Sequence, residues 1–167
     1  VDLVSLFLLQ RNVPMVDADL GDARFSSLGE APFKKYLSFA NPGSPLYTWS
    51  ESFGKDFDSF ANGNVAIVFG YQSDIAAIKE KNPFLSFGVA PMPQLAQRDL
   101  DVNYASYWGL VVSATSRAPS IAWDFIGTAT LNNDVIGPYL EASGRTPALR
   151  TLIANQINDP NTGIFAR

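Results

Sequence analysis

Cysteine and histidine are both absent from the 167 residues of this chain. Their absence excludes disulfides, Cys/His zinc sites, thiol nucleophiles and Ser-His-Asp triads, because each of these needs at least one of the two side chains. A chain without cysteine is compatible with an oxidising compartment but does not identify one, since many cytosolic domains also lack it. We expect no metal site and no cofactor.

Positive charge is also scarce. The chain has 12 Lys and Arg against 16 Asp and Glu, a formal net charge of −4, and the basic residues are scattered. Nucleic-acid binding is therefore disfavoured, because it normally uses a clustered basic face to neutralise phosphates. Apolar runs such as Leu6 to Leu9 are far too short to cross a bilayer, so no membrane-spanning helix is expected.

Apolar side chains, by contrast, are plentiful. Hydrophobic residues make up 47% of the chain and aromatic residues 13%, which is enough for a packed core and argues against disorder. The length suits one domain or parts of two. The chain opens on Val1-Asp2-Leu3-Val4 with neither a Met nor a charged lead into a secretory signal. We interpret it as a segment of a longer polypeptide.

The most informative stretch runs from Phe60 to Pro93. Asn62-Gly63 ends a helix, and Val65 to Phe69 is a continuous apolar run of the kind found in buried strands. Gly70-Tyr71 then leads at once into a polar helix start at Ser73 or Asp74. An aromatic side chain at the mouth of a strand, next to such a helix start, suggests a binding cleft.

The rest of the chain mixes helical and extended patterns. Ser26 or Ser27 begins one helix with Glu30 as its capping-box partner, and a stripe of Phe53, Phe57 and Phe60 marks another. Helices are predicted over residues 2–10, 26–40, 50–61, 73–81 and 116–130, from 132 with a break near Gly137-Pro138, and over 148–156. Strands are predicted over residues 65–69, 87–90 and 108–113, and the polar 94–103 loop as a boundary between two lobes. The pattern indicates an α/β or α+β fold in which helices outweigh strands.

Four pieces carry a resemblance to a known family. They are FANGNVAIVFGYQSDI, FGVAPMP, YWGLVVSATSRAPSIAWDFI and EASGRTPALRTLI, in that order along the chain. They resemble the extracytoplasmic solute-binding proteins of carbohydrate ABC importers, the family that includes maltose-binding protein. From about Ser50 the resemblance covers most of the chain, and the upstream LFLLQRNVPMVD and FKKYLSFANP are similar to helices of the family's second lobe.

The resemblance implies an α/β, periplasmic-binding-protein-like (type II) fold of two lobes. Residues 1–105 would form the second, C-terminal lobe, residues 106–109 the hinge crossing, and residues 110–167 the helices and strand that return to the first lobe. The fold would be incomplete, because the first lobe's opening strands, the signal sequence and any lipid-anchor cysteine are not in this sequence. We expect the isolated segment to dimerise or to swap elements through its uncovered apolar surface.

The resemblance also implies a function. Such a protein binds a carbohydrate outside the cytoplasmic membrane, in the periplasm or lipid-anchored, and delivers it to an ABC permease without chemical change. The first alternative is a solute-binding protein for a peptide, amino acid or anion. An enzyme acting on glycosides would need paired carboxylates, and the acids here, Asp74 with Asp101 or Glu141, form no recognisable pair. A third alternative is an interaction module.

The first of these pieces, and the loop before Ser50, supply candidate ligand-binding residues. Gly70 and Tyr71 stand where sugar-binding relatives place cleft residues, and an aromatic ring packs well on the C–H face of a sugar. Asp74 could accept hydrogen bonds from sugar hydroxyls or serve only as the first acid of its helix. Trp49 could line the rim of the cleft or pin its own loop.

The remaining candidates lie at the hinge and in a later turn. Trp108, beside Gly109, could stack on a sugar or pack between lobes, and Tyr107 and Tyr104 are its weaker neighbours because alternate strand residues face away. Arg145 could hold vicinal hydroxyls or a carboxylate, or be a surface arginine. The aromatic residues Trp123 and Phe125, like the Phe53, Phe57 and Phe60 stripe, are interpreted as core.

Overall fold

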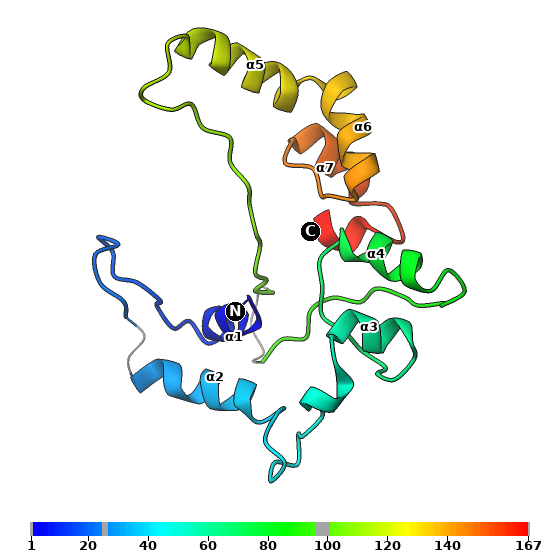
Figure 1. The fold of residues 1–167 in the computed structure, drawn as a ribbon. Coiled ribbons are helices and arrows are strands. Elements are labelled where there is room, and N and C mark those ends of the chain that lie inside the picture. Colours follow the sequence, from blue (N-terminus) through cyan, green and yellow to red (C-terminus); the bar gives the residue numbers. More distant parts are fainter. Residues whose placement is uncertain (1, 25–26, 96–100, 167) are drawn as a thin grey trace. The chain divides into compact units, whose positions relative to one another are not determined.

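Helices dominate the computed structural model, which describes residues 2–24, 27–95 and 101–166 (Figure 1). In this part of the chain the α-helices are α1 (Asp2–Gln10), α2 (Ser27–Leu37), α3 (Asp56–Ala61), α4 (Asp74–Lys81), α5 (Pro119–Leu131), α6 (Asn133–Ser143) and α7 (Arg150–Gln156). Two short 3₁₀ helices, η1 (Glu51–Phe53) and η2 (Gly163–Ala166), complete it. Ser26 and residues 96–100 of the predicted boundary loop lie outside the described residues.

The predicted strands are wrong for this structure. Residues 65–69, 87–90 and 108–113 have no strand assignment, and the described residues contain a single isolated antiparallel bridge, between Val16 and Ala23. An apolar run becomes a strand only when a neighbouring segment pairs with its backbone N–H and C=O groups. No such ladder forms over these three runs, so the helix-rich part of the prediction is confirmed and the strand part is not.

A single glycine explains a second correction. The helix expected over residues 50–61 is divided into η1 and α3, because Gly54 between them has φ of 71°, which a helix cannot contain. Phe53 therefore does not lie on the same helix as Phe57 and Phe60. Its ring instead stacks on Trp49, with the ring centroids 5.4 Å apart. Phe57 and Phe60 remain half-buried on α3.

The chain divides into two compact units. Unit 1 contains Val1–Gly54 and Met92–Tyr107, and unit 2 contains Lys55–Pro91 and Trp108–Arg167. No helix of the described residues is long and apolar enough to span a membrane.

Unit 1 is built on α1, which packs against α2. Leu6, Phe7 and Leu8 of α1 are buried together with Val13. Gln10 ends the helix and is only 1% exposed. Its amide Nε2 donates to the carbonyls of Pro93 at 3.0 Å and Val102 at 3.2 Å, and its Oε1 accepts from the Leu95 N–H at 3.0 Å. One buried side chain therefore joins the two ends of the 94–103 loop.

Unit 2 has its best-buried residues where α3 meets α4: Ser59, Ala61 and Ile78. Lys81 forms an ion pair with Asp58 and, mainly through this hydrogen bond, holds the pKa of that carboxyl below its usual range. Farther along the unit, the interpretation of Trp123 and Phe125 as core is wrong. They are 55% and 71% exposed on α5.

Replacing Gln10 should destabilise unit 1. Gln10→Leu leaves two partly buried carbonyls and one N–H without their side-chain partner, which should lower the free energy of unfolding by about 1–3 kcal/mol. Gln10→Glu should behave similarly at neutral pH, because a carboxylate cannot donate to the two carbonyls. Urea unfolding and hydrogen exchange at the Leu95 amide measure both effects. Lys35→Leu, an exposed change on α2, is the control, and equal stability of Gln10→Leu and Lys35→Leu would contradict the role of Gln10.

Candidate functional site

The segment before α4 is held by a tight local turn. The Asp74 carboxylate Oδ2 accepts from the Tyr71 backbone N–H at 2.7 Å, and the Asp74 N–H donates to the Tyr71 carbonyl at 3.0 Å. Ser73, the other predicted cap, makes no side-chain capping bond. Asp74 therefore closes the turn and orients the backbone that carries Tyr71, whose side chain is 40% exposed.

Gly70 fits this turn because it has no side chain. A Cβ placed on Gly70 would lie 2.9 Å from Asp74 Oδ2 and 3.1 Å from the Phe57 ring. Such distances are too short for a carbon atom in ordinary van der Waals contact. Phe57 of α3 and Asp74 of α4 thus close over the backbone of Gly70, directly beside Tyr71.

The turn after α6 lies against the same segment. Asn132 begins α6 by accepting from the Asp134 N–H at 2.9 Å, and Gly144 ends it in the left-handed conformation with φ of 62°. The predicted break near Gly137-Pro138 is wrong, because α6 continues through Pro138. A Cβ on Gly144 would lie 3.6 Å from the Cα of Ser73. The structure therefore brings the turn that carries Arg145 against the start of α4, so the Tyr71 and Arg145 pieces of the prediction meet.

Gln72 links these pieces by hydrogen bonds. Its Oε1 accepts from Thr146 Oγ1 at 3.1 Å and from Gln156 Nε2 at 2.5 Å, and Gln156 Nε2 also donates to the Thr162 carbonyl at 3.0 Å. The sequence analysis missed Gln72, Thr146 and Gln156. No local pattern could have found them, because the partners of Gln72 are 74 and 84 residues away.

A small solvent-open pocket forms at this junction. Its volume is about 230 Å³, below the roughly 300–1,000 Å³ of drug-sized ligand sites, so it suits one ring or one end of a solute. Apolar and hydrogen-bonding groups share its lining, which consists of Gln72, Gly137, Leu140, Glu141, Arg145, Pro147, Leu152 and Gln156. This mixture can pack a ring and bond several hydroxyls at once.

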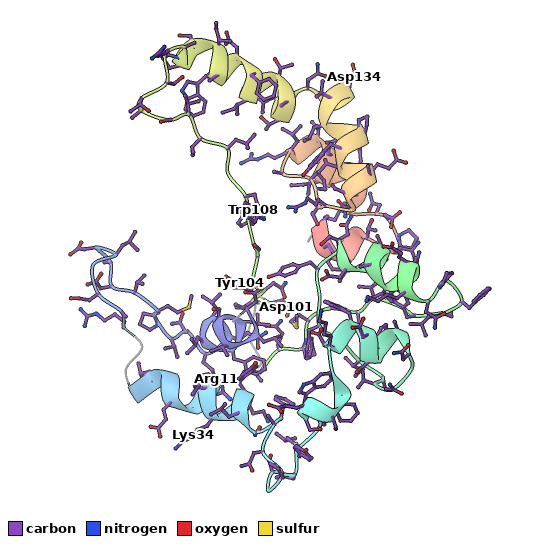
Figure 2. All side chains as sticks on the ribbon, viewed as in Figure 1. Arg11, Lys34, Asp101, Tyr104, Trp108 and Asp134 are labelled. Atoms are coloured by element: carbon purple, nitrogen blue, oxygen red, sulfur yellow. The ribbon has the colours of Figure 1, made fainter. Side chains whose placement is uncertain are left out.

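The hinge candidates lie elsewhere. Figure 2 shows Tyr104 and Trp108 along the irregular segment that precedes α5. Trp108 is 86% and Tyr107 85% exposed, and Tyr104 is half-buried. None of the three lines the pocket at Gln72. In unit 1, Trp49 is half-buried against Phe53. Its backbone N–H donates to the Phe39 carbonyl at 3.0 Å, which helps to hold its own loop.

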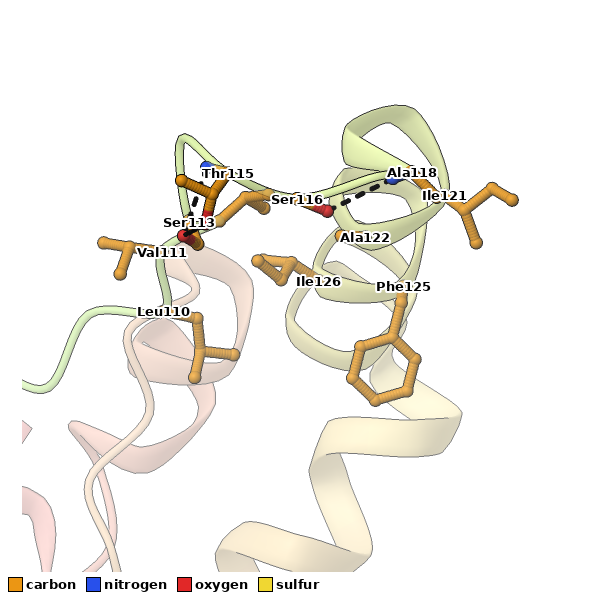
Figure 3. Close-up of a pocket in the computed structure, with 11 residues that line it drawn as sticks. Leu110, Val111, Ser113, Thr115, Ser116, Ala118, Ile121, Ala122, Phe125 and Ile126 are labelled. Carbon is orange, nitrogen blue, oxygen red and sulfur yellow. Dashed lines mark hydrogen bonds between the residues drawn. The ribbon is translucent and has the colours of Figure 1, made fainter.

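A larger hollow of about 800 Å³ lies between residues 110–118 and α5. Figure 3 shows Ile126 of α5 pointing toward the segment that carries Leu110. The polar groups here serve their own turns: Ser116 Oγ accepts from the Ala118 N–H at 3.3 Å, and Ser113 Oγ from the Thr115 N–H at 3.3 Å. The remaining lining is apolar, so this hollow suits packing rather than a hydroxyl-rich solute. Among the described residues no cluster of three or more acidic side chains could hold a metal ion.

Comparison with known families decides the class of protein. A family model described as bacterial extracellular solute-binding protein matches residues 15–161, which is most of the chain. The chain belongs to this family. No curated protein and no solved structure matches it.

Membership in this family establishes the general function of the protein. The family binds solutes for import, is located outside the cytoplasm, and has a solute and a transporter as its partners. Its members are generally not enzymes. The predicted solute-binding class and extracytoplasmic location are thereby confirmed.

The close packing at Gly70 can be tested directly. Gly70→Ala should force Asp74 or Phe57 aside and lower the free energy of unfolding by about 1–3 kcal/mol. The Tyr71 N–H should then exchange faster with solvent, because its hydrogen bond to Asp74 is disturbed. Gly88→Ala is the matched control, since a Cβ there meets nothing within 4 Å. Urea unfolding and amide exchange of both variants measure the difference. Equal behaviour of the two alanine variants would show that Gly70 is not tightly packed.

The Asp159 turn after α7 should be sensitive to acid. Asp159 Oδ1 accepts from the N–H groups of Thr162 at 2.6 Å and Asn161 at 2.8 Å and from the Thr162 hydroxyl at 3.0 Å, which lowers the pKa of Asp159. A lowered folded-state pKa means that this stabilisation is present above the unfolded pKa of about 4 and is lost as pH falls through the folded value.

The measurement is an NMR titration of the Thr162 amide from neutral to acid pH. In the wild type its signal should follow the ionisation of Asp159, with a midpoint below about pH 4. Asp159→Asn keeps an acceptor oxygen and removes the charge, so its Thr162 signal should not titrate. A midpoint at or above the ordinary aspartate range would contradict the role of the turn.

Proposed function

We propose that this solute-binding protein binds a carbohydrate outside the cytoplasmic membrane and delivers it, chemically unchanged, to the permease of an ABC importer. The observation that carries the proposal is the junction at Gln72, where the start of α4 and the Arg145 turn form one small pocket. The family match supports solute binding and import, and the pocket lining supports a solute with both an apolar face and hydroxyls.

The proposed ligand contacts combine stacking and hydrogen bonding. Tyr71 is not itself among the lining residues of the pocket, but as the neighbour of Gln72 it would supply an aromatic face to the solute, and Gly70 allows the close packing of its turn. Arg145 supplies a fork of donors for vicinal hydroxyls, and Glu141, opposite in charge, supplies acceptors. Asp74 acts mainly through the Tyr71 turn. Trp108, Tyr107 and Trp49 are also proposed to contact the solute.

The proposed fold is the type II periplasmic-binding-protein-like arrangement. The second lobe would be residues 1–105, the crossing 106–109, and the returning part 110–167. The apolar surface of residues 110–126 supports this arrangement, because side chains such as Val111 and Phe125 are 84% and 71% exposed and would pack in the core of the first lobe. Closure of two lobes on the solute would then form the surface that the permease recognises.

A second solute class has one observation in its favour. Arg145 is the single cationic side chain of the pocket lining, and its planar fork binds carboxylates in two-point fashion. A solute with a carboxylate, such as an acidic sugar, an amino acid or a peptide, would use it directly. Glu141 in the same lining opposes a purely anionic solute, which is why a neutral or mildly acidic sugar is preferred.

The test is a thermal-shift and calorimetry screen of the full-length protein as expressed in its host. The panel contains maltose, cellobiose, xylobiose and galacturonate, with glutamate, trialanine and phosphate as the non-sugar arm. A sugar at a hundred times its Kd should stabilise the fold by about 2.7 kcal/mol. A response to the non-sugar arm with none to any sugar would refute the carbohydrate assignment.

Trp108 provides the matching mutational test. Trp108→Ala should weaken binding of the responding sugar by about tenfold, because an aromatic stacking surface is lost. Trp123→Ala, a second exposed tryptophan in unit 2 that lines neither pocket, should leave affinity within twofold of the wild type. Equal affinities of the two alanine variants would exclude Trp108 from the binding surface. Calorimetry at one temperature gives both values.

A further inference from the structure

The oxygen Oε1 of Gln72 joins three segments of unit 2. Gln72 lies directly between Tyr71 and Ser73, at the start of α4. Its two donors, Thr146 Oγ1 at 3.1 Å and Gln156 Nε2 at 2.5 Å, come from the turn after α6 and from the last residue of α7. Thr146 directly follows Arg145 in the chain. A hydrogen-bonded path from Tyr71 to Arg145 therefore passes through Gln72 and Thr146.

These hydrogen bonds are placed to set geometry rather than to hold the fold. Thr146 is exposed and Gln72 is half-buried, and bonds that water can replace contribute little to global stability. The packing of Gly144 on Ser73, with its distance of 3.6 Å for a Cβ, fixes how closely the turn approaches but not how far it slides along α4. Directional bonds from Gln72 restrict this sliding. Such restriction matters because a binding site needs its side chains held to within about 0.5 Å.

We propose that Gln72 is a positioning residue, which holds Tyr71 and Arg145 in one register through the Thr146 hydroxyl and the Gln156 amide. The proposal rests on the proposed function in one respect only, that Tyr71 and Arg145 contact the same solute. Its structural part, the coupling of the two segments, stands independently of which solute binds.

The variants separate the effect of the Thr146 hydroxyl from that of side-chain shape. Thr146→Val keeps the branched side chain and loses the donor, Thr146→Ser keeps the donor, and Thr151→Val is the same change at an exposed threonine of α7. Two-dimensional NMR of the full-length protein without solute is recorded for all three. Thr146→Val should shift or broaden the backbone amides of both Tyr71 and Arg145, while Thr146→Ser and Thr151→Val leave them near their wild-type positions.

Calorimetry with maltose and with glutamate as probes supplies the functional readout. Loss of one neutral hydrogen bond corresponds to a weakening of about threefold to tenfold, which is expected for Thr146→Val with whichever probe binds. The melting temperature should change little, and Thr146→Ser should restore affinity to within twofold. Combined with Gln72→Met, the Thr146→Val change should add nothing further, because the shared bond is already absent.

Two outcomes overturn the proposal. The first is wild-type positions for the Tyr71 and Arg145 amides in Thr146→Val. The second is additive losses of affinity in Gln72→Met and Thr146→Val, which would mean that the two residues act separately. Failure of the proposed function looks different: maltose and the other sugars fail to bind the wild type, while the solute-free spectra still report whether Gln72 couples the two segments.

Discussion

The side-chain amide of Gln72 is the interaction on which the candidate site depends. In a protein with paired strands, backbone ladders hold distant segments in register, but the described part of this chain has no ladder in that region. In unit 2 the side chain of Gln72 holds distant segments together instead. Its single oxygen accepts from Thr146 and Gln156, 74 and 84 residues away, and so determines which parts of the chain face the pocket.

Unit 1 uses the same device under different physical conditions. Gln10 bonds to Pro93, Leu95 and Val102 from a position that is 1% exposed. Because the Gln10 side chain is itself buried, its polar atoms depend on these protein partners, and Gln10 contributes to stability. Gln72 is half-buried and contributes mainly to register. The two glutamines have the same chemistry but different burial, so Gln10 stabilises its unit and Gln72 mainly positions segments.

The sequence predicted the helices well and the strands badly. The range 2–10 is α1, and the helix expected from Ser73 or Asp74 is α4, because helical spacing and capping are local properties. The runs 65–69, 87–90 and 108–113 are apolar enough for strands, yet pairing depends on a partner elsewhere in the chain. Trp123 and Phe125 failed as core for the same reason, since an apolar side chain is buried only where another segment covers it.

By itself, the sequence excluded histidine and cysteine chemistry, located the main helices, and carried the resemblance to solute-binding proteins that the family match confirmed. It also singled out Gly70, Tyr71, Asp74 and Arg145. Only the tertiary structure decided that Asp74 closes the Tyr71 turn and that Gln72 ties this turn to Thr146. The difference is one of range, because a helix bonds residues four positions apart, whereas the bonds of Gln72 exist only after the chain has brought distant segments together.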